Sequence, residues 1–176
     1  AGAYLMSNLP QKLMPTADRN QFAVEITLPT GTAIDKTTRV ADSLSHILQK
    51  DPRILSVTSF KGCASPRFHT TYAPQIAGTN YAQFIINTTG VQATEELLDE
   101  YTPKFTDYFP EASVRFKQLS YSQSAYPIEI RLSGESVDIL TENANKVVNM
   151  LHQIPELRLI HTNFNEPQAA TKVVLK

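Results

Sequence analysis

The chain has 176 residues, a net charge of −1 at pH 7 and no tryptophan. This length allows one or two domains with a real hydrophobic core. The near-neutral charge creates no strong field toward nucleic acid or an anionic membrane, and the single Cys63 cannot form an internal disulfide.

The first third of the chain predicts a strand, a helix and a second strand. Gln21–Leu28 is rich in β-branched and aromatic residues and ends at a Pro-Thr-Gly turn. Apolar residues then recur at helical spacing from Ile34 to Leu48, and the Asp51-Pro52 step ends this helix. Ile54–Phe60 is predicted to be the next strand.

A long loop is predicted over Lys61–Thr79, where two glycines and two prolines interrupt any periodicity. Loops of this length are uncommon in compact domains and indicate a functional segment. The aromatic rings of Phe60, Phe68 and Tyr72 flank or lie in this loop. They either form an apolar pocket for varied ligands or seal the loop onto the edge of the sheet.

A second unit follows, with strands at Asn80–Thr88 and Ala112–Leu119 and a helix from Val91 to Tyr108 between them. Pro103 is expected to kink this helix because proline has no backbone N–H to donate. In the second strand, Val114 and Phe116 alternate with Arg115 and Lys117, so the cations lie on the opposite face from the core.

The third unit repeats the pattern after a polar linker, Tyr121–Ala125. Strands are predicted at Pro127–Leu132, Leu157–Phe164 and Thr171–Leu175, and an amphipathic helix is predicted at Val137–Leu151.

Right-handed crossovers place both helices of the first two units on one face of the sheet. The sequence therefore predicts an α+β fold, a ferredoxin-like βαββαβ domain followed by an incomplete second βαβ-β unit. The face that carries Arg115 and Lys117 must meet water or a neighbour.

Motifs for catalysis are missing from the sequence. It has no nucleophile elbow, no P-loop and no dinucleotide-binding glycine motif. None of the histidines has metal-ligand spacing to another histidine or to the cysteine. We expect no enzyme, catalytic residue, cofactor or resident metal, and the scattered aromatic and basic residues do not indicate nucleic-acid binding.

A series of short motifs resembles the resistance-nodulation-division (RND) efflux transporters of the acriflavine-resistance, hydrophobe-amphiphile type. The match is to the large extracytoplasmic loop after the seventh transmembrane helix, in the carboxy-terminal half. The motifs are Leu13-Met14-Pro15, Asp18-Arg19, Gln21-Phe22, Val24-Glu25-Ile26, Leu28-Pro29, Gly31-Thr32, Thr37-Thr38, Ser56–Phe60, Pro66-Arg67-Phe68 and Asn80–Gln83.

The resemblance implies a division of the chain into three parts. Residues 1–15 are the end of the preceding membrane helix, residues 16–121 are a complete first porter subdomain, and residues 126–176 are the first half of a second, up to a docking insertion. The implied protein is a proton-driven multidrug antiporter of the bacterial inner membrane that confers antibiotic resistance, with this segment in the periplasm. It works as a homotrimer with a periplasmic adaptor and an outer-membrane channel, and its proton-relay residues lie in membrane helices outside this chain.

Two segments correspond in position to the family's path for amphiphilic small molecules. The switch-loop-like segment contributes Phe60, Lys61, Gly62, Pro66, Arg67, Phe68 and Tyr72, and the cleft strand contributes Arg115, Lys117 and Leu119. The sequence departs from the best-known multidrug members, which have aromatic residues where Arg115 and Lys117 stand. The departure allows an amphiphile with an anionic end. Metal export is disfavoured because Met6, Met14 and Met150 are scattered.

Two alternatives stay open: a stand-alone ferredoxin-like module that binds a small ligand, and an enzyme of the same fold. The apolar side of the unfinished second unit is also expected to drive self-association of this chain.

Overall fold

The computed structural model describes residues 18–67, 78–119, 126, 128–162 and 164. Four strands and three helices are described in this part of the chain. In order they are β1 (Gln21–Thr27), α2 (Ile34–Leu48), β2 (Ile54–Lys61), β3 (Tyr81–Thr88), α3 (Val91–Phe105), β4 (Ser113–Gln118) and α4 (Val137–Leu151).

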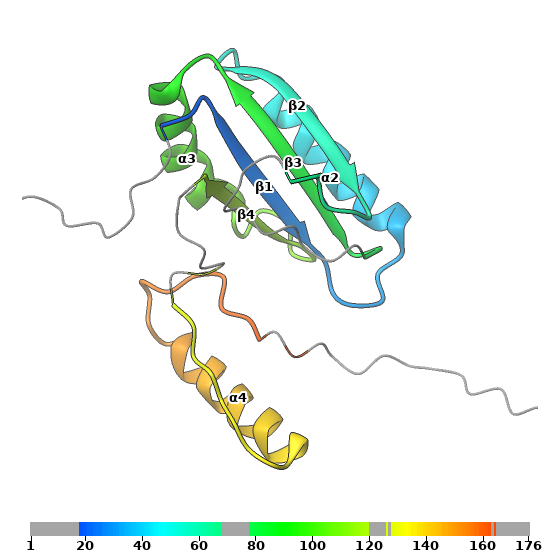
Figure 1. The fold of residues 1–176 in the computed structure, drawn as a ribbon, viewed down its shortest axis with the longest axis vertical. Coiled ribbons are helices and arrows are strands. Elements are labelled where there is room, and N and C mark those ends of the chain that lie inside the picture. Colours follow the sequence, from blue (N-terminus) through cyan, green and yellow to red (C-terminus); the bar gives the residue numbers. More distant parts are fainter. Residues whose placement is uncertain (1–17, 68–77, 120–125, 127, 163, 165–176) are drawn as a thin grey trace, which may run out of the picture.

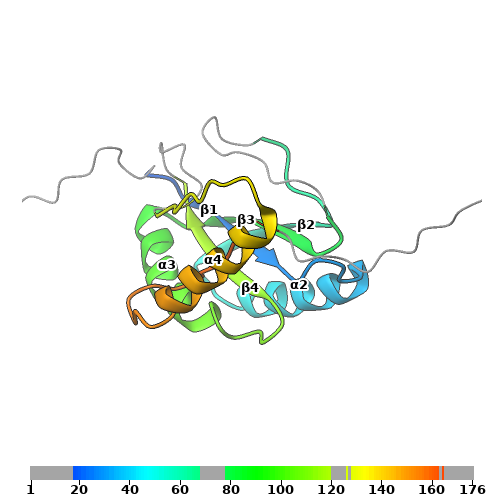
Figure 2. The same ribbon diagram turned by 90° about the horizontal axis from the view of Figure 1, so that it is seen from below.

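The four strands form one sheet in the order β2-β3-β1-β4, and every neighbouring pair is antiparallel. Helices α2 and α3 both cover the same face of this sheet, whereas α4 lies apart from it (Figures 1 and 2). The parallel strands β1 and β2 do not pair with each other, because β3 lies between them and bonds to both. This is the predicted ferredoxin-like arrangement.

The core lies between the sheet and the helices α2 and α3. Alternate strand residues and one stripe of each helix supply it, as the periods of strands and helices require. Its fully buried members include Phe22, Val24, Ile26, Leu44, Leu48, Phe84, Ile86, Leu97 and Val114. Phe116 also packs there, which confirms the predicted alternation along β4.

Helix α3 ends at Phe105, earlier than the predicted end at Tyr108. Pro103 lies in its last turn. Since proline cannot donate the backbone hydrogen bond that would continue the helix, a helix with proline in this position ends soon after it.

The predicted third helix is confirmed at Val137–Leu151. It begins after Ser136, whose Oγ accepts a hydrogen bond from the Ile139 N–H at 3.5 Å. No residue of α4 is buried.

The two strands predicted on either side of α4 are wrong for the described residues. Residues 128–132 and 157–162 have no strand conformation. In the first unit the parallel strands are held by the strand between them, and nothing in the described chain pairs with residues 128–132 in that way. Without a ladder, an apolar alternation alone does not fix a strand. The prediction at Thr171–Leu175 falls outside the described residues.

Candidate functional site

The face of the sheet that points away from α2 and α3, called here the outer face, carries a row of four side chains. Cross-strand register aligns Phe60 of β2 with Gln83 of β3, Gln83 with Glu25 of β1, and Glu25 with Arg115 of β4. Residues opposite each other in antiparallel strands share a face. The row therefore joins the two segments that the sequence predicted to form a substrate path.

Two cations on β4 flank a single carboxylate in this row. Arg115 Nη1 lies 3.8 Å from Glu25 Oε2, and Lys117 Nζ lies 4.0 Å from Glu25 Oε1. The side chains are largely buried, with 7% of Glu25 exposed and about a fifth of each cation. Burial lowers the pKa of Lys117, and the charge of Glu25 opposes this shift.

Tyr81 lies on the outer face of β3, two residues before Gln83, and only 7% of it is exposed. Its hydroxyl has no hydrogen-bond partner in the described part of the chain. Burial raises its pKa far above the ordinary value, and the nearby charge of Glu25 adds to this shift. The phenol therefore keeps its proton and remains a hydrogen-bond donor.

The loop after β2 starts by folding onto the same face. The Gly62 N–H donates to the Tyr81 carbonyl at 2.8 Å, and the Ser65 N–H donates to Gln83 Oε1 at 2.7 Å. Ser65 is buried, as is Gln83 beneath it. The centre of the outer face thus meets a neighbour, the loop itself, rather than water.

The linker residue Tyr126 connects this face to the third unit. The Arg115 guanidinium lies over the Tyr126 ring, 4.5 Å from its centroid. The Tyr126 hydroxyl lies 3.1 Å from His161 Nε2, and the two rings meet at 4.9 Å in an edge-on arrangement. A ring that faces a guanidinium restricts its orientation through a cation–π contact.

The structure gathers some of the predicted site residues and disperses others. Phe60 and Arg115 lie in one row, and Gly62 anchors the loop, whereas Pro66 and Arg67 are exposed. Lys61 forms an ion pair with Asp42 on α2. Leu119 is buried, with 1% exposed, and Phe68 and Tyr72 lie outside the described residues.

Sequence reasoning missed Glu25, Tyr81 and Gln83. Polar residues at alternate positions of otherwise apolar strands are a signal for an outer-face site. The sequence did not reveal that the loop after β2 would fold onto Gln83.

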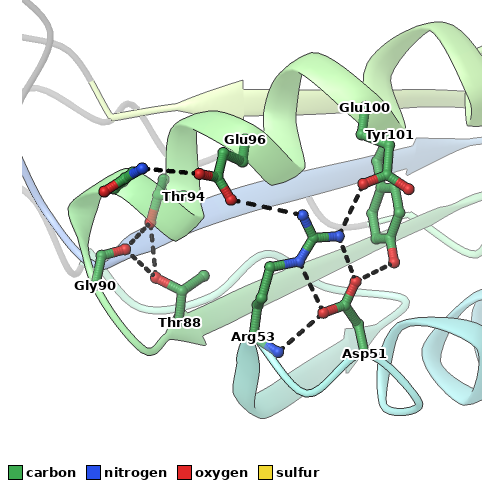
Figure 3. A network of polar contacts seen from close by, with 9 residues as sticks. Asp51, Arg53, Thr88, Gly90, Thr94, Glu96, Glu100 and Tyr101 are labelled. Atoms are coloured by element: carbon green, nitrogen blue, oxygen red, sulfur yellow. Dashed lines mark hydrogen bonds and ion pairs between the residues drawn. The ribbon is translucent and has the colours of Figure 1, made fainter.

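A second polar cluster lies on the helix side of the sheet and has a structural role (Figure 3). Arg53 donates to both oxygens of Asp51, at 3.0 and 2.7 Å, and to Glu100 at 2.8 Å. The Tyr101 hydroxyl donates to Asp51 at 2.6 Å. The bonds from Arg53 are the largest cause that holds the pKa of Asp51 well below its usual range, and burial raises the pKa of Tyr101 to about 12. This cluster fastens the α2–β2 turn to α3.

Other kinds of site are not found among the described residues. No group of three or more histidine, cysteine or carboxylate side chains in this part of the chain could hold a metal ion. No helix of the described segments is long and apolar enough to cross a membrane. A shallow depression of about 390 Å³ lies at the start of β1 and the β3–α3 turn, and it contains no predicted site residue.

Comparison with known proteins decides the family. The model of the AcrB/AcrD/AcrF family matches residues 1–176. The chain belongs to this family. The predicted relationship to RND efflux transporters is thereby confirmed, and the family is one of transporters rather than enzymes.

Solved structures support the fold. A heavy metal efflux pump in crystal form I matches with a TM-score of 0.58 at 15% identity, over 88% of this chain and 17% of that one. Crystal form II of such a pump matches with a TM-score of 0.57 at 16% identity, over 86% and 17%. At these identities the likeness shows the fold alone, and the chain spans about a sixth of those pumps. A search of curated proteins found no match.

Proposed function

We propose that this chain is a periplasmic porter segment of a proton-driven RND pump of the bacterial inner membrane, which exports amphiphilic and multidrug substrates. Residues 16–121 form the first porter subdomain of the carboxy-terminal half, and residues 126–176 begin the second. The intact pump is a homotrimer that works with a periplasmic adaptor and an outer-membrane channel.

The observation that carries this proposal is the row from Phe60 to Arg115 on the outer face. It brings an aromatic ring at the base of the loop and a cation at the sheet edge onto one surface. A surface with apolar rings at one end and fixed polar groups at the other suits an amphiphile, because each part of the ligand meets matching chemistry.

The test replaces Phe60 with alanine in the intact pump. We expect a changed substrate range, with resistance to bulky apolar compounds lowered about 4-fold or more, since aromatic contact area contributes to ligand affinity. Resistance of cells to a panel of amphiphiles is measured, and cross-linking reports trimer assembly. Energising by protons is checked with a protonophore, which should abolish export of a fluorescent amphiphile.

Tyr108→Ala is the matched control. Tyr108 is also aromatic and is 53% exposed, but it lies just beyond α3 and packs edge-on against Phe105 of the core rather than on the outer face. It should leave the substrate range unchanged. Unaltered resistance to every compound in the Phe60→Ala pump would argue that this ring only seals the loop.

A further inference from the structure

The Tyr81 hydroxyl is a buried polar group whose position in the fold is not explained by any internal bond. It has no partner in the described chain, and 7% of the residue is exposed. A buried hydroxyl without a hydrogen bond is energetically costly, so such groups are usually satisfied by protein, water or ligand. In contrast, the Tyr101 hydroxyl on the helix side is satisfied by Asp51 at 2.6 Å.

Two cations contact the acidic neighbour of Tyr81 on the outer face, Glu25. Tyr81 lies opposite Thr27, two residues along β1 from Glu25 on the same face, and Glu25 contacts both Arg115 and Lys117. Tyr126, which contributes to the raised pKa of Tyr81, lies under the Arg115 guanidinium. The donor therefore belongs to the same cluster as two cations. Donors of this kind together are what an anionic oxygen group requires.

We propose that Tyr81, Arg115 and Lys117 bind the anionic headgroup of an amphiphile, a carboxylate in the simplest case. This inference rests on the proposed function, because it assigns a substrate class to the same outer face. The headgroup accepts a hydrogen bond from the Tyr81 hydroxyl and interacts with the two cations.

Glu25 limits the affinity of this site for an anionic headgroup. It offsets the cost of burying two cations when no ligand is present. An entering carboxylate then meets repulsion from Glu25 as well as attraction from Arg115 and Lys117. The headgroup reaches them from the sheet edge, because β4 is the outermost strand and both cations keep about a fifth of their side chains exposed.

The test titrates the whole 176-residue chain with decanoate and with decyltrimethylammonium, below their micelle concentrations, and follows backbone amide signals by NMR. The two probes have the same tail and opposite charge. We expect decanoate to bind about 10-fold more tightly, as a charge-assisted hydrogen bond and two cations would produce. Equal affinity for the two headgroups overturns the proposal.

Tyr81→Phe and Tyr101→Phe form a matched pair of variants. Tyr81→Phe should weaken decanoate binding about 5-fold, the loss of one hydrogen bond, and leave the melting temperature unchanged or higher. Tyr101→Phe should lower the melting temperature and leave decanoate binding unchanged. Unchanged decanoate affinity in Tyr81→Phe overturns the proposal.

Substitutions of the cationic and acidic residues should change the affinity for decanoate in opposite directions. Lys117→Met should remove most of the preference for decanoate, whereas Lys50→Met, an exposed lysine just after α2, should not. Glu25→Gln keeps the shape and should strengthen decanoate binding, because the repulsion is gone. Weaker binding in Glu25→Gln would contradict the inference.

Failure of this inference can be separated from failure of the proposed function. If the pump exports apolar amphiphiles but the chain does not discriminate between the headgroups, the headgroup site is wrong and the porter assignment stands. If the chain discriminates but the Phe60→Ala pump behaves like wild type for every compound, the headgroup site stands and the substrate path is wrong.

Discussion

Arg53 links the two βαβ halves of the packed unit through hydrogen bonds. Its guanidinium bonds to Asp51 on its own turn and to Glu100 on α3, and Tyr101 donates to the same Asp51. Asp51 is 10% exposed, so removal of its charge leaves buried donors without their acceptor. The cost of such a loss exceeds that of an exposed ion pair.

Asp51→Asn should therefore lower the free energy of unfolding by about 2 kcal/mol at pH 7. The pKa of Asp51 is held below its ordinary value of 3.8, chiefly by the hydrogen bonds from Arg53. On acidification, Asp51 is therefore protonated at a lower pH in the folded state than in the unfolded state. The stabilisation that it provides is present above about pH 4 and is lost as the pH falls further. Urea unfolding at pH 7, 4 and 3 should show the difference between wild type and variant shrinking.

Glu96→Gln is the control for this prediction. Glu96 lies 3.9 Å from Arg53 and is 50% exposed, so its neutralisation should change the unfolding free energy by about 0.5 kcal/mol or less. Equal effects of the two substitutions, or a wild-type difference that stays constant down to pH 3, would show that Asp51 is not the anchor.

Glu25 shows what the sequence can and cannot predict about a single residue. The strand alternation around Val24 and Ile26 places Glu25 on the face away from the core, and the structure has it there. Its near-complete burial depends on its register with Gln83 and Arg115 and on the two cations of β4 that contact it. Contacts between residues so far apart in sequence are not contained in a local pattern.

Strand β2 passes into the following loop through Gly62. This glycine has φ +74°, a left-handed conformation, and its N–H bonds to β3. A Cβ atom there would lie 2.9 Å from Ile34 Cδ1 at the start of α2. The left-handed backbone favours glycine at this junction, and an added Cβ would also push aside the end of the Ile34 side chain.

Gly62→Ala should lower the unfolding free energy by about 2 kcal/mol, the sum of left-handed strain and a contact with Ile34. Chemical denaturation measures the change. The double variant Ile34→Val, Gly62→Ala removes the crowding atom and should recover the steric part but not the strain.

Gly31 supplies the comparison, since it has φ +88° and an added methyl group there would have no neighbour within 4 Å. Gly31→Ala should cost only the strain, about 1 kcal/mol. If Gly62→Ala cost no more than Gly31→Ala, contact with Ile34 would not limit this junction.

Among the elements, helices and the first sheet were predictable because their signals are local. Apolar stripes at helical spacing located α2 and α4, and α4 has the predicted bounds. The prediction of strands beside α4 was wrong because strand formation is not a local property. A strand requires a partner, and the pattern at residues 128–132 says nothing about whether that partner is present.

For the molecule as a whole, the described chain contains one packed unit and one helix whose apolar stripe is not buried. Val137 of the stripe is 59% exposed and the rest of the stripe is half-buried, while Ile139 and Met150, which lie beside the stripe, are 61% and 66% exposed. The preceding segment adds Ile128 and Ile130, which are 64% and 54% exposed. Apolar surface gathered in this way tends to associate, because burial removes it from water.

We therefore expect the 176-residue chain to self-associate through α4 and the segment before it. Sedimentation velocity across a hundredfold range of concentration should show a dimer or larger species that grows with concentration. Val148→Glu, within the stripe, should shift the distribution toward monomer, because a charge in an apolar contact is costly. Asn145→Glu, at an exposed position outside the stripe, should not. A strictly monomeric wild-type chain at the highest concentration would show that the stripe is not adhesive in isolation.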